Sequence, residues 1–213
     1  MGFITFFLSA SAAVATFLFT VNLLKSSPKR LLVLGMPQSG KTTLLKILRD
    51  EKNSGEYIAT NSTRTLETYK IKFKESEIVL GETMDIPGDF DQQISALNND
   101  VKDFFKEKNG LILYMINCND LNSVKLVDYS CKILRKAFDA YEKANVAIIY
   151  SHPDETKLDE NDLNIIHKNI YEKLKAAEFE ILAEKFLKSK HYMINLVSKD
   201  AKERLEKVFK DCK

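Results

Sequence analysis

Short apolar runs alternate with amphipathic stretches along most of this chain. Runs of about strand length that lack charged residues are typical of strands buried on both faces of a sheet. They occur at residues 31–34, 111–116, 146–150 and 192–197. Hydrophobic residues at helical spacing predict helices, here at residues 43–50, 91–108, 124–144, 160–188 and 199–209. Residues 51–65 are polar and carry loop signals.

A strict alternation of apolar and polar residues predicts a half-buried hairpin in the middle of the chain. Its first strand covers residues 68–73, residues 74–77 form the turn, and its second strand starts at residue 78 and ends near Asp85. We therefore expect an α/β fold for residues 30–213. It has a six-stranded, mostly parallel sheet with helices on both faces and one antiparallel edge strand. Ligands of such sheets lie beyond the carboxyl ends of the strands.

The amino-terminal segment has a different composition from the rest of the chain. Residues 1–24 contain no charged side chain, and as a helix they are long enough to cross a hydrocarbon core, which takes about 20 residues. The short basic linker that follows, residues 25–29, contains Lys25 and Lys29 and places the remainder of the chain in the cytosol by the positive-inside rule. A cleaved signal peptide is the alternative, but the usual basic n-region is missing. We predict one transmembrane anchor.

The first buried strand leads into the spacing Gly-x4-Gly-Lys-Thr, and a helix follows directly. Gly35 and Gly40 allow a tight turn whose N–H groups cradle a polyphosphate, and the helix start adds its positive dipole end. Lys41 is expected to reach the terminal phosphates, and the hydroxyl of Thr42 to bind Mg²⁺. The predicted phosphate-binding residues of this loop are Gly35, Gln38, Ser39, Gly40, Lys41, Thr42 and Thr43.

A second motif, Asp85-Ile-Pro-Gly88, ends the next predicted strand. A carboxylate at that place holds Mg²⁺, and the N–H of Gly88 contacts a third phosphate. Thr60 is expected to close onto both from the polar loop, with Thr63 as the other candidate. The predicted metal ligands are thus Thr42, Thr60 and Asp85. A plain Pro-Gly turn is the structural alternative.

Charge and cysteine content exclude other classes of protein. The net charge of +2 comes from 32 basic and 30 acidic side chains spread along the chain, so we expect no direct binding of nucleic acid. The cysteines, Cys118, Cys131 and Cys212, form no CxxC pair, which favours free thiols in a reducing compartment.

These motifs resemble the small G-proteins over residues 30–213, in the form seen in their Arf and Sar branch. With a membrane helix directly before the domain, the chain is similar to the signal recognition particle receptor beta subunit family. The resemblance implies a P-loop small G-protein fold that binds GTP or GDP with Mg²⁺. It implies an endoplasmic reticulum membrane protein that recruits the receptor alpha subunit for co-translational targeting, with the ribosome and translocon as indirect partners. It also assigns guanine contacts to Asp154 and Ser198.

Two positions depart from the small G-protein pattern. The guanine-reading Asn-Lys-x-Asp is Ser151-His152-Pro153-Asp154 here, which we expect to remove a contact that braces the loop. Asp89 stands where Gln or His orients water, and its charge would oppose a nucleophile near phosphate. We therefore expect GTP hydrolysis that is slow or absent. Two other functions stay open, another membrane-anchored P-loop NTPase and a degenerate G domain that acts as a constitutive scaffold.

Overall fold

The computed structural model describes residues 30–51, 64–66, 69–74, 77–80, 82–99, 110–140, 144–177 and 179–212. Its centre is a six-stranded sheet in the order β2-β5-β1-β6-β7-β8, in which every neighbouring pair is parallel except β2 with β5. The strands are β2 Arg64–Leu66, β5 Glu82–Asp85, β1 Arg30–Gly35, β6 Leu111–Asn117, β7 Asn145–Ser151 and β8 Lys190–Ile194. The predicted α/β fold with a mostly parallel sheet is confirmed.

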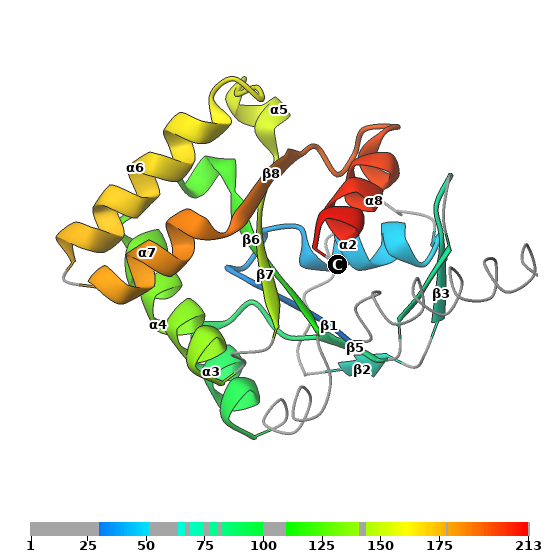
Figure 1. Cartoon of the computed structure of the whole chain (residues 1–213), viewed down its shortest axis with the longest axis horizontal. Coiled ribbons are helices and arrows are strands. Elements are labelled where there is room, and N and C mark those ends of the chain that lie inside the picture. The colour runs from blue at the N-terminus through cyan, green and yellow to red at the C-terminus, as the bar shows by residue number, and fades with distance from the viewer. Residues whose placement is uncertain are drawn as a thin grey trace, which may run out of the picture.

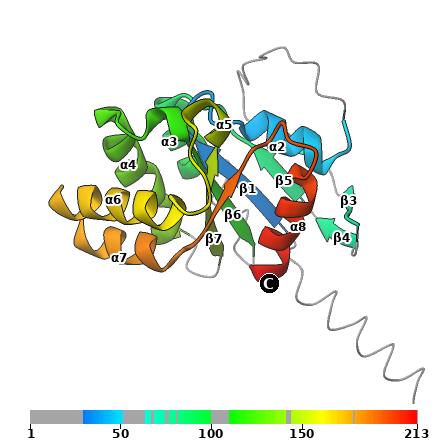
Figure 2. The same cartoon turned by 90° about the horizontal axis from the view of Figure 1, so that it is seen from above.

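Helices cover both faces of this sheet and divide its core in two (Figures 1 and 2). Successive residues of β1 point to opposite faces, so Leu32 and Leu34 belong to one buried cluster while Leu31 and Val33 belong to the other. The first cluster is covered by α3 Phe90–Asn99, α4 Val124–Ala140, α6 Leu163–Ala176 and α7 Glu180–Lys188. The second is covered by α2 Lys41–Leu48 and α8 Ala201–Asp211. Two short turns, η1 Cys118–Asp120 and α5 Pro153–Thr156, follow β6 and β7.

The predicted hairpin forms only in part, because its second strand, predicted from residue 78 to near Asp85, is two strands, and the later one, β5, belongs to the main sheet. Among the described strands, β3 Tyr69–Lys72 and β4 Glu77–Leu80 pair with each other and with no third strand. The apolar side chains of the hairpin pack on the α2 and α8 side of the molecule, where the rings of Phe73 and Phe209 lie 5.8 Å apart. The edge strand is β2, inside the stretch predicted to be mostly loop. A three-residue strand is too short to show a period of two.

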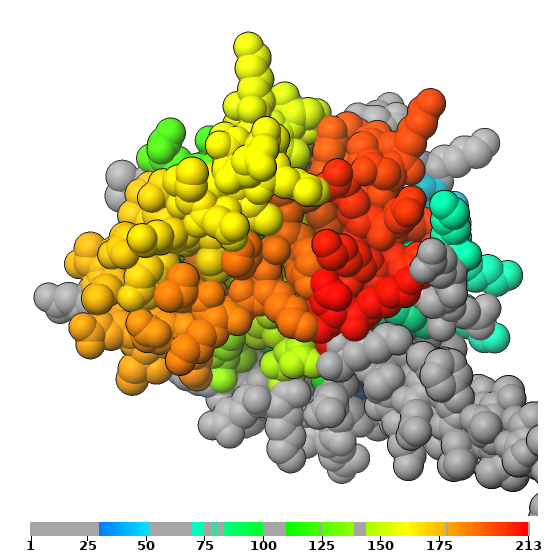
Figure 3. Space-filling model, turned by 45° about the horizontal axis from the view of Figure 1, so that its top comes forward, coloured from blue at the N-terminus to red at the C-terminus, as the bar shows by residue number. Residues whose placement is uncertain are grey.

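The long helix predicted at residues 160–188 is two helices. α6 ends at Ala176 and α7 starts at Glu180, and α7 folds back onto α6 so that the rings of Phe186 and His167 stack at 4.4 Å. No glycine or proline marks the break. We therefore attribute it to the packing of α7 on α6 rather than to the local sequence. In the space-filling view of Figure 3, α6, α7 and α8 form much of the described surface on that side.

The predicted anchor, residues 1–24, and the linker, residues 25–29, lie outside the described residues. Within the described part of the chain, no helix has the length and apolar character needed to span a membrane.

Candidate functional site

The loop between β1 and α2 is shaped by two glycines that no other residue can replace without strain. Gly35 has φ +145°, and a Cβ there would lie 2.4 Å from the carbonyl oxygen of Met115 on β6. Gly40 has φ +86°, and its Cβ would lie 2.6 Å from Leu196 Cδ1. The backbone therefore turns back on itself at the carboxyl end of the sheet, as a phosphate-binding loop does.

The start of α2 presents a positive helix end to this loop. Gly40 is the residue before the helix and makes no side-chain cap, and no acidic residue lies in the first turn. The dipole end is therefore not neutralised by the helix's own side chains, which favours an anion at this place. Thr42 and Thr43 lie in this first turn and are half-buried.

Lys41 is held deep in the loop as a nearly buried cation. Its side chain is 6% exposed, and Nζ donates to Gly35 O and Met36 O, each at 2.9 Å. Burial lowers the pKa of Lys41 to about 8, while the negative charge of Asp85 acts in the opposite direction. A charge with so little water around it interacts strongly with a phosphate that enters the loop.

The Asp85–Gly88 loop lies directly against the phosphate-binding loop. Asp85 ends β5, pairs in register with Val33 of β1, and is 7% exposed. A Cβ at Gly88 would lie 2.7 Å from Pro37 Cα and 3.0 Å from Lys41 Nζ. The two sequence motifs are therefore in contact.

Two polar residues brace the phosphate-binding loop: Ser151, from the stretch predicted to read guanine, and Asn117, which no motif indicated. Ser151 Oγ donates to Ser39 O at 2.9 Å, and Asn117 Nδ2 donates to Gln38 O at 3.2 Å. The expectation that losing the usual Asn removes a bracing contact is therefore wrong, since Ser151 makes one. The sequence does carry a signal for both residues, because each is the first polar one after an apolar run that predicts a buried strand. In the structure the two residues end β6 and β7 and pair in register.

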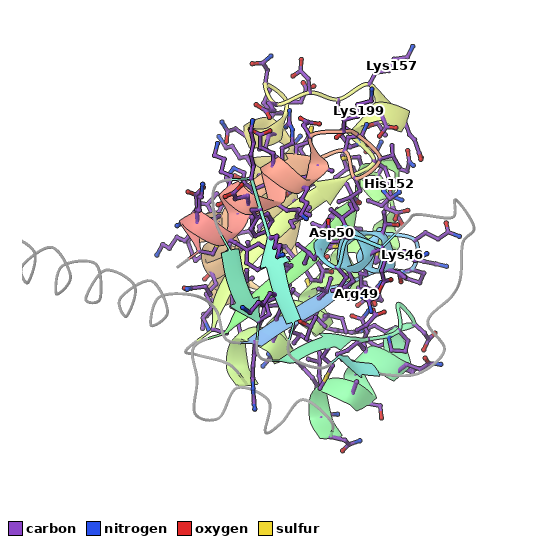
Figure 4. All side chains as sticks on the ribbon, turned by 90° about the vertical axis from the view of Figure 1, so that its right-hand side faces the viewer. Lys46, Arg49, Asp50, His152, Lys157 and Lys199 are labelled. Carbon is purple, nitrogen blue, oxygen red and sulfur yellow. The ribbon has the colours of Figure 1, made fainter. Side chains whose placement is uncertain are left out.

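The stretch predicted to read guanine lies at the same edge of the sheet. His152 has φ +58°, its Nδ1 lies 3.0 Å from Ser151 Oγ, and its Cε1 lies 3.4 Å from the position of a Cβ on Gly40. Figure 4 shows His152 near α2, which carries Lys46. Asp154 is exposed in the short helix α5 that follows.

Ser198 and Asp89 both make local contacts. The hydroxyl of Ser198 donates to Asn195 O at 2.7 Å in the turn after β8. Asp89 is exposed, and its Oδ1 accepts a hydrogen bond from Gln92 N at 3.1 Å, which is the bond of a helix N-cap. Asp89 is therefore the N-cap of α3, which begins at Phe90.

Of the predicted metal ligands, Thr42 and Asp85 lie among the described residues and Thr60 does not. Its alternative, Thr63, also lies outside the described residues. Among the residues that the structure does describe, no group of three or more His, Cys, Asp or Glu side chains is arranged to hold a metal ion. The predicted Mg²⁺ site differs from such a group, because Thr42 and Asp85 would share the ion with phosphate and water.

Comparison with known proteins places this site in a family of G proteins. No curated protein gave a match to the chain. The model of the Gtr1/RagA G protein conserved region matches residues 30–196, from the first residue of β1 to the turn that follows β8. This match confirms a G domain that binds guanine nucleotide, but it does not confirm the receptor beta subunit. The chain belongs to the Gtr1/RagA family of G proteins.

Proposed function

We propose that this protein is a guanine-nucleotide switch in which Lys41 binds the phosphates and Gly88 reads the third one. The observation that carries the proposal is the contact between the two motifs, with the Cβ position of Gly88 only 3.0 Å from Lys41 Nζ. A third phosphate placed next to Lys41 comes within reach of the backbone at Gly88. A diphosphate ends one phosphate earlier and leaves that backbone without its anion.

Mg²⁺ fits two further side chains of the same site. Asp85 supplies a nearly buried carboxylate at the end of β5, and Thr42 supplies a hydroxyl in the first turn of α2. These are hard oxygen ligands, which Mg²⁺ prefers in combination with phosphate oxygens and water. The ion would neutralise charge on the phosphates, while Asp85 and Thr42 would fix its position.

Guanine recognition is assigned to Asp154, with Ser198 in the adjoining loop. A carboxylate accepts hydrogen bonds from the guanine N1–H and exocyclic amine, and adenine offers no such pair of donors. His152 stands where the family motif Asn-Lys-x-Asp has lysine, and its ring lies beside Gly40 at the start of α2. The ring would offer a flat surface on which a base could pack.

Hydrolysis is proposed to be slow, because Asp89 is used as the N-cap of α3. A carboxylate that accepts from Gln92 N is directed toward its own helix. It is therefore not placed to orient an attacking water, as Gln or His does at this position. Nucleotide exchange or a partner protein would then control the lifetime of each state.

The finer prediction of a signal recognition particle receptor beta subunit receives no support from the family match, which names a different branch. Its alpha-subunit partner and its endoplasmic reticulum location stay predictions. Both depend on the proposed anchor at residues 1–24, outside the described residues.

Nucleotide identity is the test of the proposed function. The full chain in detergent is stripped of nucleotide and titrated with GTP, GDP and ATP, in parallel with Lys41→Ala and Lys46→Ala. We expect wild type and Lys46→Ala to bind GTP and reject ATP, because Lys46 lies further along α2. Lys41→Ala should lose about 100-fold or more in affinity, the effect of removing a charged hydrogen-bond donor from a buried site.

Other outcomes would favour the alternatives. Equal binding of ATP and GTP would contradict the switch and favour a P-loop ATPase or kinase. No binding of any nucleotide would favour a scaffold.

A further inference from the structure

Two side chains from different helices hold the Asp85–Gly88 loop against the phosphate-binding loop. Gln93 of α3 is fully buried, and its Nε2 donates to Gly35 O at 2.7 Å and to Pro87 O at 2.8 Å. Tyr129 of α4 is 7% exposed, and its hydroxyl donates to Gly88 O at 2.7 Å and lies 3.2 Å from Gly35 O. Gln93 and Tyr129 together are called the loop clamp below.

The chemistry of the clamp determines how each side chain is oriented. Both amide hydrogens of Gln93 are used on carbonyl oxygens, and the reversed amide would place its oxygen against those same acceptors. Oε1 is buried and has no hydrogen-bond partner in the described structure. A buried polar atom without a partner lowers the stability of the fold, so this orientation is stabilised by the two bonds that Nε2 makes. Burial raises the pKa of Tyr129 far above its usual range, so its hydroxyl stays a donor.

The clamp holds the carbonyl groups of the Asp85–Gly88 loop, while Gly88 lies against the phosphate-binding loop. The carbonyls of Pro87 and Gly88 are both engaged by the clamp. The direction of a Cβ at Gly88 leads to Pro37 and Lys41 Nζ. Because Gly35 O is a shared acceptor, the clamp also connects Gly88 to the end of β1, which carries the phosphate-binding loop.

We propose that Gln93 and Tyr129 are positioning residues that set the preference for guanosine triphosphate over diphosphate, because they hold Gly88 beside Lys41 before nucleotide binds. The inference rests on the proposed function of Lys41 and Gly88. A group held in place in advance needs no ordering when the ligand arrives, so its contact adds more to affinity. Removing the clamp should weaken the contact that only the third phosphate makes.

The chain offers a matched control for the tyrosine. Tyr114 of β6 is also buried, and its hydroxyl shares a hydrogen bond with Ser130 Oγ at 2.9 Å. That hydrogen bond joins β6 to α4 and involves neither loop. Tyr129→Phe and Tyr114→Phe therefore each remove one buried hydroxyl and keep the ring, but only the first releases Gly88.

The experiment titrates the full chain with GDP and with a non-hydrolysable GTP analogue in the presence of Mg²⁺. We expect Tyr129→Phe and Gln93→Met each to lower affinity for the triphosphate about three- to ten-fold, the value of one or two hydrogen bonds. Affinity for GDP should stay within about twofold, because GDP does not reach Gly88. Tyr114→Phe should lower the melting temperature without changing the ratio of the two affinities.

Three results would overturn the inference, and they are distinguishable. An unchanged affinity ratio in Tyr129→Phe and Gln93→Met, with wild type still binding guanine nucleotide, would make the clamp structural only and leave the proposed function standing. Equal loss of both nucleotides would mean that the clamp supports the phosphate-binding loop through Gly35. Failure of wild type to bind either nucleotide would remove the proposed function, and the inference with it.

Discussion

At the scale of single residues, Lys41 shows how burial and charge together define this site. Its Nζ donates to two carbonyl oxygens, lies near the Gly88 backbone, and is influenced by the charge of Asp85. Carbonyl oxygens are weaker partners for an ammonium group than phosphate is. A bound polyphosphate would therefore give the ammonium group stronger hydrogen-bond partners than these carbonyl oxygens.

The pH dependence of nucleotide affinity follows from this environment. The pKa of Lys41 is lowered to about 8, so the lysine is charged below pH 8 and loses its proton as the pH rises through 8. Phosphate binds the charged form, so affinity should be full below pH 8 and fall above it, by up to about tenfold per pH unit. Isothermal titration from about pH 7 to about pH 9.5 measures this fall.

Lys41→Arg is the control for this pH prediction. The guanidinium stays charged over the whole range, so any affinity that the variant retains should not fall above pH 8. A wild-type affinity that stays constant to pH 9.5 would contradict the prediction. A fall shared by the variant would point instead to titration of the nucleotide.

Residues that act through tertiary contacts were harder to predict than the motif residues. Gly35, Gly40 and Gly88 are recognisable from spacing, because the loop needs them wherever it occurs. Gln93 lies on the buried face of α3 with Ala96 and Leu97, so a polar residue at a core position was the available signal. Tyr129 has no such signal, since a tyrosine among apolar residues of an amphipathic helix is ordinary packing.

At the scale of elements, strands were predicted well where both faces are buried. The runs at 111–116 and 146–150 match β6 and β7, because a central parallel strand has no polar face to interrupt the pattern. The break between α6 and α7 was missed, since the helical period continues through residues 177–179. β2 was missed because its pairing with β5, rather than its own sequence, makes it a strand.

The start of α3 gives a prediction at this scale. Asp89→Ala removes the cap bond to Gln92 N and should lower the free energy of unfolding by about 1 kcal/mol. Asp91→Ala, in the first turn but not at the cap, should cost only a few tenths of a kcal/mol through the helix dipole. Chemical denaturation of the full chain measures both changes.

Hydrolysis assays with a third variant, Asp89→Asn, test whether Asp89 has a catalytic role. Since we assign it to the helix cap, Asp89→Asn should change the single-turnover rate of GTP hydrolysis by less than about twofold. A tenfold fall in Asp89→Asn, which keeps a capping oxygen, would show that the carboxylate acts on water.

At the scale of the whole molecule, His167 connects three elements inside the larger core. Its Nδ1 accepts from the hydroxyl of Tyr150 on β7 at 2.9 Å, and its Nε2 donates to Phe186 O on α7 at 3.0 Å. Its ring also stacks on His191 at 3.9 Å. The neutral imidazole has one nitrogen that accepts and one that donates, which matches these two partners.

Acid should therefore destabilise the fold through this one side chain. Burial, with His191 beside it, lowers the pKa of His167 from 6.5 to about 4. The contribution to stability is full above pH 6.5 and is lost as the pH falls from 6.5 toward 4, by up to about 1.4 kcal/mol per pH unit. Urea denaturation between these two pH values measures the slope.

His167→Gln should be less stable than wild type at neutral pH but should lose less stability on acidification. Equal slopes in wild type and His167→Gln would show that His167 does not titrate in this range.

The two edges of the main sheet determine how the protein behaves at high concentration. An exposed edge strand is a template on which another chain can add a strand, and short or charged edges prevent this. Here one edge is β2, with three residues, and the other is β8, whose five residues start with the exposed Lys190. Within the described residues, neither edge offers a long apolar strand to a second copy, so neither favours the addition of a further strand.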